Sequence, residues 1–533
     1  MCPRPDPSAS SCQRRLRWLS LWAAVGALAA CGGGSGGTEP PLSAGPPPAP
    51  APGPVMPPAP EPPPAPPAPA PEPPPPAPAP EPPPPPPPEP PPPPPAPTRL
   101  IVVGAVSPLP EGAETVARLA DVPWASLPPG AEVWLAAGAH TGPVTIAAQG
   151  SAARPIVLKP AVAGTTPVLS GGGLDFQGAA WVQVRGLTVE DSPWGAVVIR
   201  RGSHHLSLVG NTLRRAYMGV DLSDGAGTGH RITGNVIEDH ATHGIAIVEV
   251  NASAADPTVI SGNTVRRNGH HGLEVHGSHY LIERNVVWGS GLTMGGTSGI
   301  HLYSRIDDAY CDDNTVRYNL SYDNHDRTAY DGNGIQADHW CDRNRIHHNL
   351  VWGNDGAGII VFDGADNLVF NNTARGNGLD PKRGPEQVGE VILSSQGPAV
   401  NRTRGNQVFN NLLLPTRAGV SGLLVDYWSQ DQPNTLGPNH YPVRTDGGGL
   451  LQRGGRRATS GEGVDSLSGS SGNLVEQPAL ANAQAPLAQG WRLLRTPSLP
   501  GLWPGDGLAD LQGVLPLSGM AFFGAYYTAA GLN

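Results

Sequence analysis

Residues 263–276 read NTVRRNGHHGLEVH, and residues 285–303 read NVVWGSGLTMGGTSGIHLY. Each segment opens with an asparagine, continues as a short apolar strand, and passes through a turn to a glycine that precedes alternating apolar residues. This alternation has the period of two that is typical of strands, and no helical period of 3.6 competes with it. The two segments are therefore two copies of one structural unit built from short strands.

The same unit recurs along the chain at spacings from the low twenties to the mid thirties of residues. The asparagines that open the units are Asn211, Asn235, Asn263, Asn285, Asn319, Asn349 and Asn372. The glycines before the second strand are Gly219, Gly244, Gly272, Gly299, Gly334 and Gly358. A polar column five residues after the asparagines contains His240, Asn268, Ser290, Asn324, Asn354 and Asn377. Repeats of this length indicate a solenoid, and stacked polar residues at its turns predict hydrogen-bonded ladders between rungs.

This pattern resembles the pectate-lyase-like superfamily of right-handed parallel β-helices. The resemblance covers residues 99–430 and includes the entry segment, WASLPPGAEVWLAAGAHTGPVTI at 124–146 and PIVLKP at 155–160. It implies an all-β solenoid, but not one activity, because this fold supports lyases, hydrolases, epimerases, adhesins and binding proteins. Residues 431–533 lose the repeat, and we expect them to form an irregular region that caps the last rungs.

The register of the repeat predicts a disulfide between Cys311 and Cys341. Each cysteine lies eight residues before a repeat asparagine, Asn319 or Asn349, so the two occupy equivalent positions on successive rungs. Neighbouring strands are about 4.8 Å apart, which is within the Cα separation that a disulfide tolerates. Two stacked free thiols are the alternative.

The N-terminal residues carry an export signal. A basic segment precedes an apolar run at residues 18–30, which is too short to span a bilayer as a stable helix. The end of this run, LAAC at residues 28–31, resembles the bacterial lipobox, which implies removal of residues 1–30 and lipid on Cys31. Gly32 in place of an aspartate implies passage to the outer membrane of a Gram-negative envelope. An ordinary signal peptide with an incidental cysteine is the alternative.

Residues 31–98 are expected to form an extended linker. They begin with glycine and serine, and residues 40–97 hold well over half of the 65 prolines. Such a segment has no core and adopts polyproline II, which at about 3.1 Å per residue reaches on the order of 180 Å. We therefore expect a spacer that holds the domain away from the membrane; a proline-motif ligand for a partner is the alternative.

The strand after each glycine is predicted to carry a polar patch. Its side chains alternate between interior and exterior, so the exterior residues form columns with one residue per rung. The first column is Asp221, Ala246, Glu274, His301, Gln336 and Ile360, and the second is Ser223, Val248, His276, Tyr303, Asp338 and Phe362. The residues before the glycines are Met218, His243, His271, Ser298, Asn333 and Ala357. Titratable residues crowd the middle rungs, which indicates acid–base chemistry.

The patch supplies candidate catalytic groups. His276 and His301 are the candidate base and acid, with Tyr303 as the alternative. Glu274 and Asp338 are acid–base partners or, together with Asp331, calcium ligands. The candidate substrate-binding residues are His243, His271, Gln336, Asn333, His339, Arg305 and Arg327. The four histidines His271, His276, His301 and His339 match no standard zinc spacing.

Trp288, Tyr322 and Trp352 share one position on three rungs. This spacing favours a structural aromatic stack, with a sugar-stacking platform as the alternative.

Three reaction types fit this patch. In β-elimination a base removes the proton next to a uronic carboxylate, and an epimerase returns that proton from the other face. Related lyases often use lysine or arginine with calcium, and this chain departs from that pattern because neither of its two lysines, Lys159 and Lys382, lies on the patch; only Lys382, on a loop, could substitute. In hydrolysis Glu274 and Asp338 would flank the bond, at a Cα separation of about 10–12 Å. A binding or structural β-helix without catalysis is the further alternative.

The sequence as a whole favours an exported enzyme that acts on an extracellular or cell-wall polysaccharide by β-elimination. The net charge of −10 argues against nucleic acid as a partner, because binding phosphates needs a basic surface. We expect a monomer that contacts the membrane only through the lipid on Cys31.

Overall fold

The structure is a computed structural model of the whole chain. It describes residues 96–305, 310–328, 330–397, 402–426, 433–480, 509–510 and 523–526. The export signal, Cys31 and nearly all of the linker lie outside these residues. Within the described part of the chain, no helix has the length and apolar character needed to cross a membrane.

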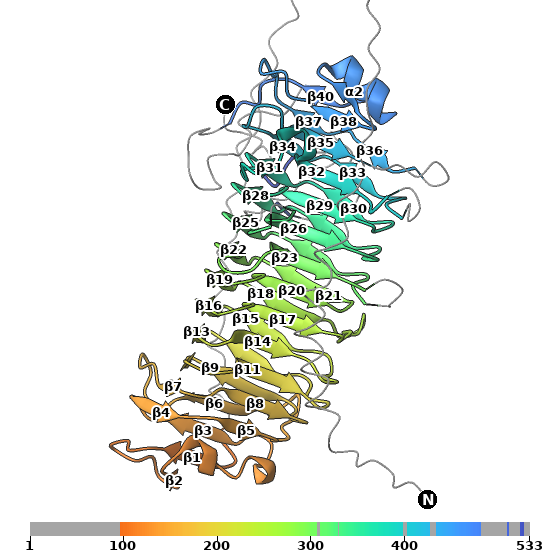
Figure 1. Cartoon of the computed structure of the whole chain (residues 1–533). Coiled ribbons are helices and arrows are strands. Elements are labelled where there is room, and N and C mark those ends of the chain that lie inside the picture. The colour runs from red at the N-terminus through yellow and green to blue at the C-terminus, as the bar shows by residue number, and fades with distance from the viewer. Residues whose placement is uncertain are drawn as a thin grey trace, which may run out of the picture. The chain divides into compact units, whose positions relative to one another are not determined.

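Three long sheets make up the domain (Figure 1). Sheet A contains β2 (Glu114–Val116), β1 (Leu100–Val103), β3 (Glu132–Leu135), β6 (Ile156–Pro160), β9 (Val182–Arg185), β12 (Ser207–Val209), β15 (Arg231–Thr233), β18 (Thr258–Ser261), β21 (Tyr280–Glu283), β24 (Thr315–Arg317), β27 (Arg345–His347), β30 (Leu368–Phe370), β33 (Gln407–Phe409) and β36 (Thr435–Leu436). Sheet B contains β4 (Ala139–Thr141), β7 (Val168–Ser170), β10 (Thr188–Glu190), β13 (Thr212–Arg214), β16 (Val236–Glu238), β19 (Thr264–Arg266), β22 (Val286–Trp288), β25 (Leu320–Tyr322), β28 (Leu350–Trp352), β31 (Thr373–Arg375), β34 (Leu412–Leu414), β37 (His440–Tyr441) and β40 (Leu474–Val475). Sheet C contains β5 (Val144–Ile146), β8 (Leu174–Gln177), β11 (Gly195–Arg200), β14 (Met218–Leu222), β17 (Ile245–Val248), β20 (Leu273–His276), β23 (Ser298–Tyr303), β26 (Asn333–Asp338), β29 (Ile359–Phe362), β32 (Gly389–Ser394), β35 (Ser421–Val425), β38 (Leu451–Arg453) and β39 (Arg456–Ala458). The short helices are η3 (Leu119–Asp121), η4 (Trp124–Ser126), η5 (Pro385–Gln387) and α2 (Gly461–Ser468).

Each full coil gives one strand to each sheet in turn, as β18, β19 and β20 do. The strands pair in parallel throughout the described residues, except that β38 and β39 pair antiparallel at the end of sheet C. The interior of the coil holds one continuous column of buried Val, Ile and Leu side chains. This is the right-handed parallel β-helix that the repeat predicts.

The repeat asparagines form a ladder at the corner between sheets A and B. Asn319 is fully buried, and its Nδ2 donates to the Oδ1 of Asn349 (3.0 Å) and to the carbonyl of Ile282 (2.9 Å). Its Oδ1 accepts from the backbone N–H of Asn285 (3.0 Å). The predicted second column forms a similar ladder between sheets B and C. In it, Asn324 Nδ2 donates to the Oδ1 of Asn354 on the neighbouring rung. A third ladder, which the sequence analysis did not find, contains Asn314, Asn344, Asn367, Asn406 and Asn434.

Gly272 shows why each coil needs a glycine at this corner. A Cβ there would lie 2.4 Å from Val287 Cγ1 and 2.6 Å from the carbonyl oxygen of Gly299, distances that side chains do not adopt. The glycine column therefore lets successive coils approach each other closely.

The predicted aromatic stack is present on sheet B. Trp288, Tyr322 and Trp352 are stacked, with ring centroids 6.1 Å and 4.1 Å apart. Their sheet is not the one that carries the polar patch, and Trp352 also packs against buried Tyr526 and Leu350. These contacts fit a structural role for the stack.

The coil continues past the point where the repeat fades. We expected an irregular region from residue 431, but β36, β37, β38 and β40 extend the three sheets as far as Val475. These strands are only two or three residues long, so they leave a weak periodic signal in the sequence. The described residues that follow, 523–526, lie against the coil, where the N–H of Gly524 donates to the Asn410 carbonyl.

Cys311 and Cys341 form the predicted disulfide, with Cα atoms 4.8 Å apart. The crosslink closes a loop with a sequence separation of 30, and both side chains are buried. Closing a loop of this size stabilises the fold by about 3–4 kcal/mol. We expect the Cys311→Ala/Cys341→Ala variant to melt several degrees lower than the natural chain. A reductant should lower the melting temperature of the natural chain alone, and an unchanged midpoint in both cases would show that the crosslink does not restrain unfolding.

Glu390 ends the ladder between sheets B and C. Its carboxyl accepts from the N–H and the Nδ2 of Asn377, and burial raises its pKa to about 7, well above the 4.5 of an exposed glutamate. A carboxyl with a raised pKa in the folded state holds its proton while the unfolded chain releases it. Stability is therefore full below about pH 4.5 and falls by about 3 kcal/mol as the pH rises to 7.

We expect Glu390→Gln to remove this part of the pH dependence, because glutamine keeps an acceptor for Asn377 without a charge. Melting curves of both proteins at pH 4.5 and pH 8 measure the effect. The variant should be the more stable protein at pH 8, and equal pH slopes for the two proteins would contradict the assignment.

Candidate active site

The register of sheet C brings the predicted columns together. Glu274 lies opposite His301, which lies opposite Gln336 on the next rung. Tyr303 lies opposite Asp338 in the second column. In β20 the alternation Leu273-Glu274-Val275-His276 turns the apolar residues inward, so that the titratable residues point outward.

The first part of the patch is a histidine–glutamate cluster, made of His243, His270, His271 and Glu274. His243 Nε2 lies 2.6 Å from Glu274 Oε2 and 2.8 Å from His270 Nδ1. Burial acts to raise the pKa of Glu274, but the neighbouring His243 acts to lower it. The effect of His243 is the larger, and the pKa falls to about 2. Burial lowers the pKa of His270 to about 3 and that of His271 well below its ordinary value. Glu274 is therefore a carboxylate, and it is not a general acid.

The second part is a proton-transfer cluster, made of His276, His301, Tyr303, Asp338 and His339. His301 Nε2 lies 3.3 Å from Asp338 Oδ2, and His339 Nε2 lies 3.7 Å from Asp338 Oδ1. Burial alone lowers the pKa of His301, but the hydrogen bond and charge of Asp338 raise it. Burial alone raises the pKa of Asp338, but His339 and His301 lower it. Each partner therefore favours the charged form of the other.

Tyr303 is the centre of this cluster. Its ring lies 5.5 Å from the rings of both His276 and His301, measured between centroids. The two histidines are 2% and 4% exposed, whereas Tyr303, Asp338 and His339 are only partly buried. The predicted base and acid thus lie below the surface, and the groups that a substrate reaches are Tyr303 and its two partly buried neighbours.

A polar network connects the cluster to Asp331. Asn333 Nδ2 donates to Asp331 Oδ1 (3.0 Å) and to Gln336 Oε1 (3.0 Å), and Ser298 Oγ donates to the same Gln336 oxygen. Burial, together with the charge of Asp338, raises the pKa of Asp331 to about 6. Asn333 and Gln336 therefore position Asp331, and neither is the open substrate-binding group that we expected.

A cleft of about 780 Å³ lies next to this network. It is lined by Thr328, Tyr330, Lys382, Arg383, Glu386, Gln387, Asp426, Gln452, Gly454 and Gly455. Arg383 Nη1 donates to the Tyr330 carbonyl (2.9 Å), and its charge acts on Asp331. Lys382 is 56% exposed at the side chain and donates to the Arg327 carbonyl. The cationic end of the cleft therefore lies near Asp331, which the charge of Asp338 also reaches.

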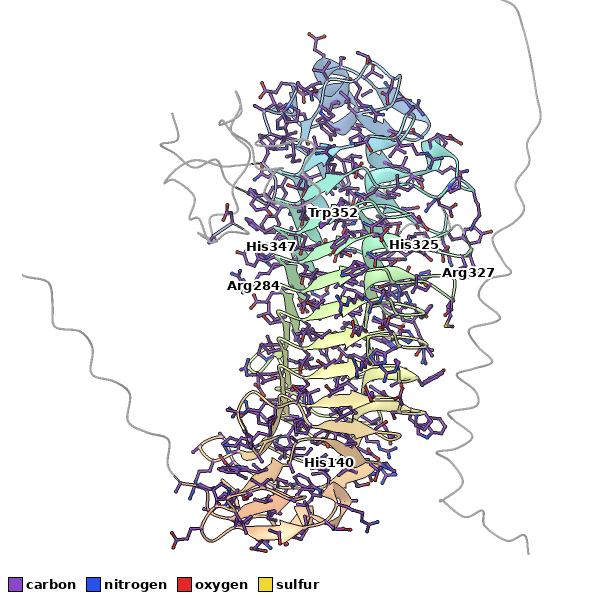
Figure 2. All side chains as sticks on the ribbon, turned by 90° about the vertical axis from the view of Figure 1, so that its left-hand side faces the viewer. His140, Arg284, His325, Arg327, His347 and Trp352 are labelled. Atoms are coloured by element: carbon purple, nitrogen blue, oxygen red, sulfur yellow. A yellow bond between two sulfur atoms is a disulfide. The ribbon has the colours of Figure 1, made fainter. Side chains whose placement is uncertain are left out.

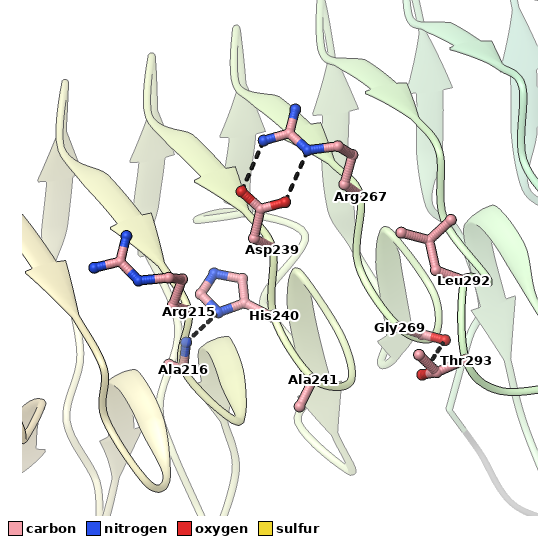
Figure 3. A pocket seen from close by; sticks show the side chains of 9 residues that line it. All are labelled: Arg215, Ala216, Asp239, His240, Ala241, Arg267, Gly269, Leu292 and Thr293. Atoms are coloured by element: carbon pink, nitrogen blue, oxygen red, sulfur yellow. Dashed lines mark hydrogen bonds and ion pairs between the residues drawn. The ribbon is translucent and has the colours of Figure 1, made fainter.

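A second hollow of about 380 Å³ has a different character (Figure 3). Its two arginines are already paired, Arg267 with Asp239 (2.7 Å) and Arg215 with Asp191 (2.9 Å). Its one histidine, His240, accepts from the Ala216 N–H as part of the ladder. We therefore place the candidate site at the larger cleft.

The two predicted binding arginines contact other protein groups. Arg305 pairs with Glu249 (2.6 Å), and Arg327 is exposed and donates to the Leu292 carbonyl (3.3 Å). Figure 2 shows Arg327 on the loop side of the coil, opposite Arg284 and His347. His243, His271 and His339 do belong to the two clusters, although the first two are turned toward other protein groups.

The proposed calcium ligands do not converge on one point. Calcium takes six to eight oxygen ligands, but Glu274, Asp338 and Asp331 each contact histidine or asparagine nitrogens instead. Within the described residues, the group of side chains that could surround an ion is the histidine–glutamate cluster, which is rich in nitrogen. These residues do not fit calcium, and we assign it no role.

One residue of the two clusters was missed by sequence reasoning. His270 directly precedes a residue of the predicted column, and the doubled histidine in GHHG was the available signal. The sequence singles out Lys382 as the one lysine that could serve a lyase, but its loop has no periodic signal that would place it at the cleft.

Comparison with known proteins supports the fold. Residues 172–374 and 246–430 match the family described as right handed beta helix region. No curated protein matches the chain. The sheet topology and this family match together define a right-handed parallel β-helix.

Several solved structures are similar at low identity. The mannuronan C-5 epimerase AlgE4 A-module of Azotobacter vinelandii is 14% identical, covers 65% of this chain and 87% of its own, and has a TM-score of 0.42. An alginate lyase from Paenibacillus sp. str. FPU-7 is 17% identical, covers 50% and 92%, and has a TM-score of 0.33. The pectate lyase Pel9A is 12% identical, covers 81% and 96%, and has a TM-score of 0.40.

Proposed function

We propose that this protein is a polysaccharide lyase that cleaves a uronic-acid-containing glycan by β-elimination. The observation that carries the proposal is the proton-transfer cluster on sheet C, together with the cleft near Asp331 that holds a lysine and an arginine. A uronate needs both features, a proton acceptor at the carbon next to the carboxylate and a positive charge for the carboxylate itself.

The proposed reaction removes one proton from carbon, breaks the glycosidic C–O bond and gives a proton to the leaving oxygen. A base removes the proton from the carbon that bears the carboxylate, a double bond forms to the neighbouring carbon, and the glycosidic oxygen leaves with a proton from an acid. Tyr303 is our candidate for the group that touches the sugar, because it is more accessible than His276 and His301. His301, held by Asp338, stacks on the Tyr303 ring and supplies a second proton-transfer group beside it.

Lys382 is the candidate for binding the substrate carboxylate. We expect Lys382→Gln to raise KM about 10-fold on an acidic glycan with little change in kcat, because the lysine contributes to binding in the ground and transition states alike. The matched control is Lys159→Gln, which changes the only other lysine, paired with Glu132 in the early coils. Equal KM values for Lys382→Gln and the natural chain would remove Lys382 from the site.

Hydrolysis is the second candidate, and one observation favours it. Asp331, with a pKa of about 6, keeps its proton below about pH 6, whereas the pKa of Asp338 is lowered, so the two carboxyls differ in protonation in weakly acidic solution. Two carboxyls of opposite protonation are what a glycoside hydrolase requires. Glu274, which we had assigned to this pair, is a buried carboxylate bound to His243 and does not fit.

The experiment is a substrate panel with the full-length protein. Acidic and neutral polysaccharides are incubated with it, and the ultraviolet absorbance of an unsaturated uronate is followed together with new reducing ends. Absorbance and reducing ends that grow together on an acidic glycan support elimination. Reducing ends alone support hydrolysis, and neither signal on any substrate would leave a binding protein.

We also propose that the domain works outside the cytoplasm, anchored through Cys31 and separated from the membrane by the proline-rich linker. A disulfide in the domain supports an oxidising compartment. Mass spectrometry of the N-terminal peptide tests the anchor: a lipidated Cys31 is expected, and an unmodified Cys31 in the mature protein would contradict it.

A further inference from the structure

We propose that His243, His270 and Glu274 bind a divalent transition metal ion of the zinc class. The ligand-bearing atoms of the histidine–glutamate cluster all lie within 4.8 Å of one another. Two imidazoles and one carboxylate form a ligand set that catalytic zinc uses, with the fourth position left open.

The hydrogen-bond geometry around His243 carries the argument. His270 Nε2 donates to the Gly295 carbonyl (3.2 Å), so in the neutral ring Nδ1 carries a lone pair. That lone pair faces His243 Nε2 at 2.8 Å, and the Glu274 carboxylate faces the same nitrogen at 2.6 Å. One Nε2–H can satisfy only one of these two acceptors. A cation placed among the three atoms satisfies them all.

The surroundings of the three atoms are those of a metal site. A metal-binding histidine usually donates its other ring N–H to a carbonyl or carboxylate, as His270 does to Gly295. Tetrahedral zinc bonds of about 2.0–2.2 Å place ligand atoms about 3.3–3.6 Å apart, so the contacts of 2.8 Å and 2.6 Å would each lengthen by about 0.5–1 Å. His270 and Glu274 are buried, so water does not compete freely for the ion.

His271 lies beside the proposed ion but is not one of its three ligands. Its Nδ1 accepts from the Ser298 N–H (3.0 Å), so the neutral ring carries its proton on Nε2. That Nε2 is buried, since the residue is only 1% exposed, and it has no hydrogen-bond partner. A water or anion at the open metal position would accept this N–H, which explains a buried donor that otherwise has no partner.

The test is metal content of the full-length chain. The protein is stripped with a chelator, dialysed against Zn²⁺, and its metal is measured by mass spectrometry; Co²⁺ is then bound as a spectroscopic probe of coordination. We expect one metal ion per chain and a four- or five-coordinate Co²⁺ spectrum, with no comparable binding of Ca²⁺. His243→Gln and Glu274→Gln should each weaken Zn²⁺ binding more than about 100-fold, since loss of a ligand exceeds the loss caused by its hydrogen-bond partner.

His140→Gln is the matched control, because His140 lies in the first coils, far along the domain from the cluster (Figure 2). Circular dichroism shows whether each variant folds, and His270→Gln replaces any variant that does not. Absence of metal from the folded natural chain, or equal metal in the natural chain and His243→Gln, would overturn the proposal. Metal content is read without a substrate, so an inactive protein that binds zinc would contradict only the proposed lyase activity.

Discussion

Replacing Tyr303 by phenylalanine lowers the rate of uronan cleavage by about 10²- to 10⁴-fold, which is the contribution that a positioned acid or base makes. The substitution removes one oxygen and keeps the ring that lies against His276 and His301, so the fold and the substrate cleft remain. The loss is therefore expected in kcat and in kcat/KM equally, as for a group that acts in the transition state. Initial rates on an acidic glycan measure it.

Two further variants show whether the loss is specific to Tyr303 and its cluster. Tyr217→Phe removes the same oxygen from an exposed tyrosine beside β14, several rungs away on sheet C, and should leave the rate unchanged. Asp338→Asn should lower the rate as well, because the carboxylate that holds His301 is lost. A fully active Tyr303→Phe protein would transfer the role to Asp338 or His339, the other groups that a substrate reaches.

Replacing Asn319 by alanine destabilises the domain by about 3–5 kcal/mol. The buried amide donates to Ile282 and Asn349 and accepts from Asn285, so its removal leaves several buried backbone and side-chain groups without partners. Each such group costs about 1–3 kcal/mol when it stays buried and unpaired. Thermal or denaturant unfolding measures the loss.

Asn251→Ala is the comparison for this prediction, because Asn251 is exposed and accepts from the Ser278 N–H outside the ladder. Its effect should stay below about 1 kcal/mol. Equal unfolding midpoints for the two variants would mean that the ladder is a consequence of the coil's geometry and does not stabilise the fold.

The ladders and the columns of the patch could be predicted because they are periodic. A residue at a fixed distance from each repeat asparagine must return to the same corner or face, whatever the length of the loop between rungs. This is why the sequence places Glu274, His301 and Gln336 in one column and predicts the disulfide between Cys311 and Cys341.

Burial within the patch could not be predicted in this way. Alternation shows that His276 points out of the coil, but not that loops then cover it to 2% exposure. Tyr310 is one loop residue that packs on His276, with ring centroids 4.7 Å apart, and the placement of loop residues depends on contacts that have no period. The sequence therefore predicted the residues of the two clusters better than their roles.

The most direct test of the proposed activity is proton NMR of an acidic polysaccharide treated with the full-length protein. Elimination replaces the proton next to the carboxylate by a double bond, so we expect the signal of an unsaturated sugar at each new non-reducing end. We also expect Tyr303→Phe to produce little of this signal. New non-reducing ends that keep the original proton would contradict the proposal, since they would show that the cluster adds water to the glycosidic bond and does not remove the proton.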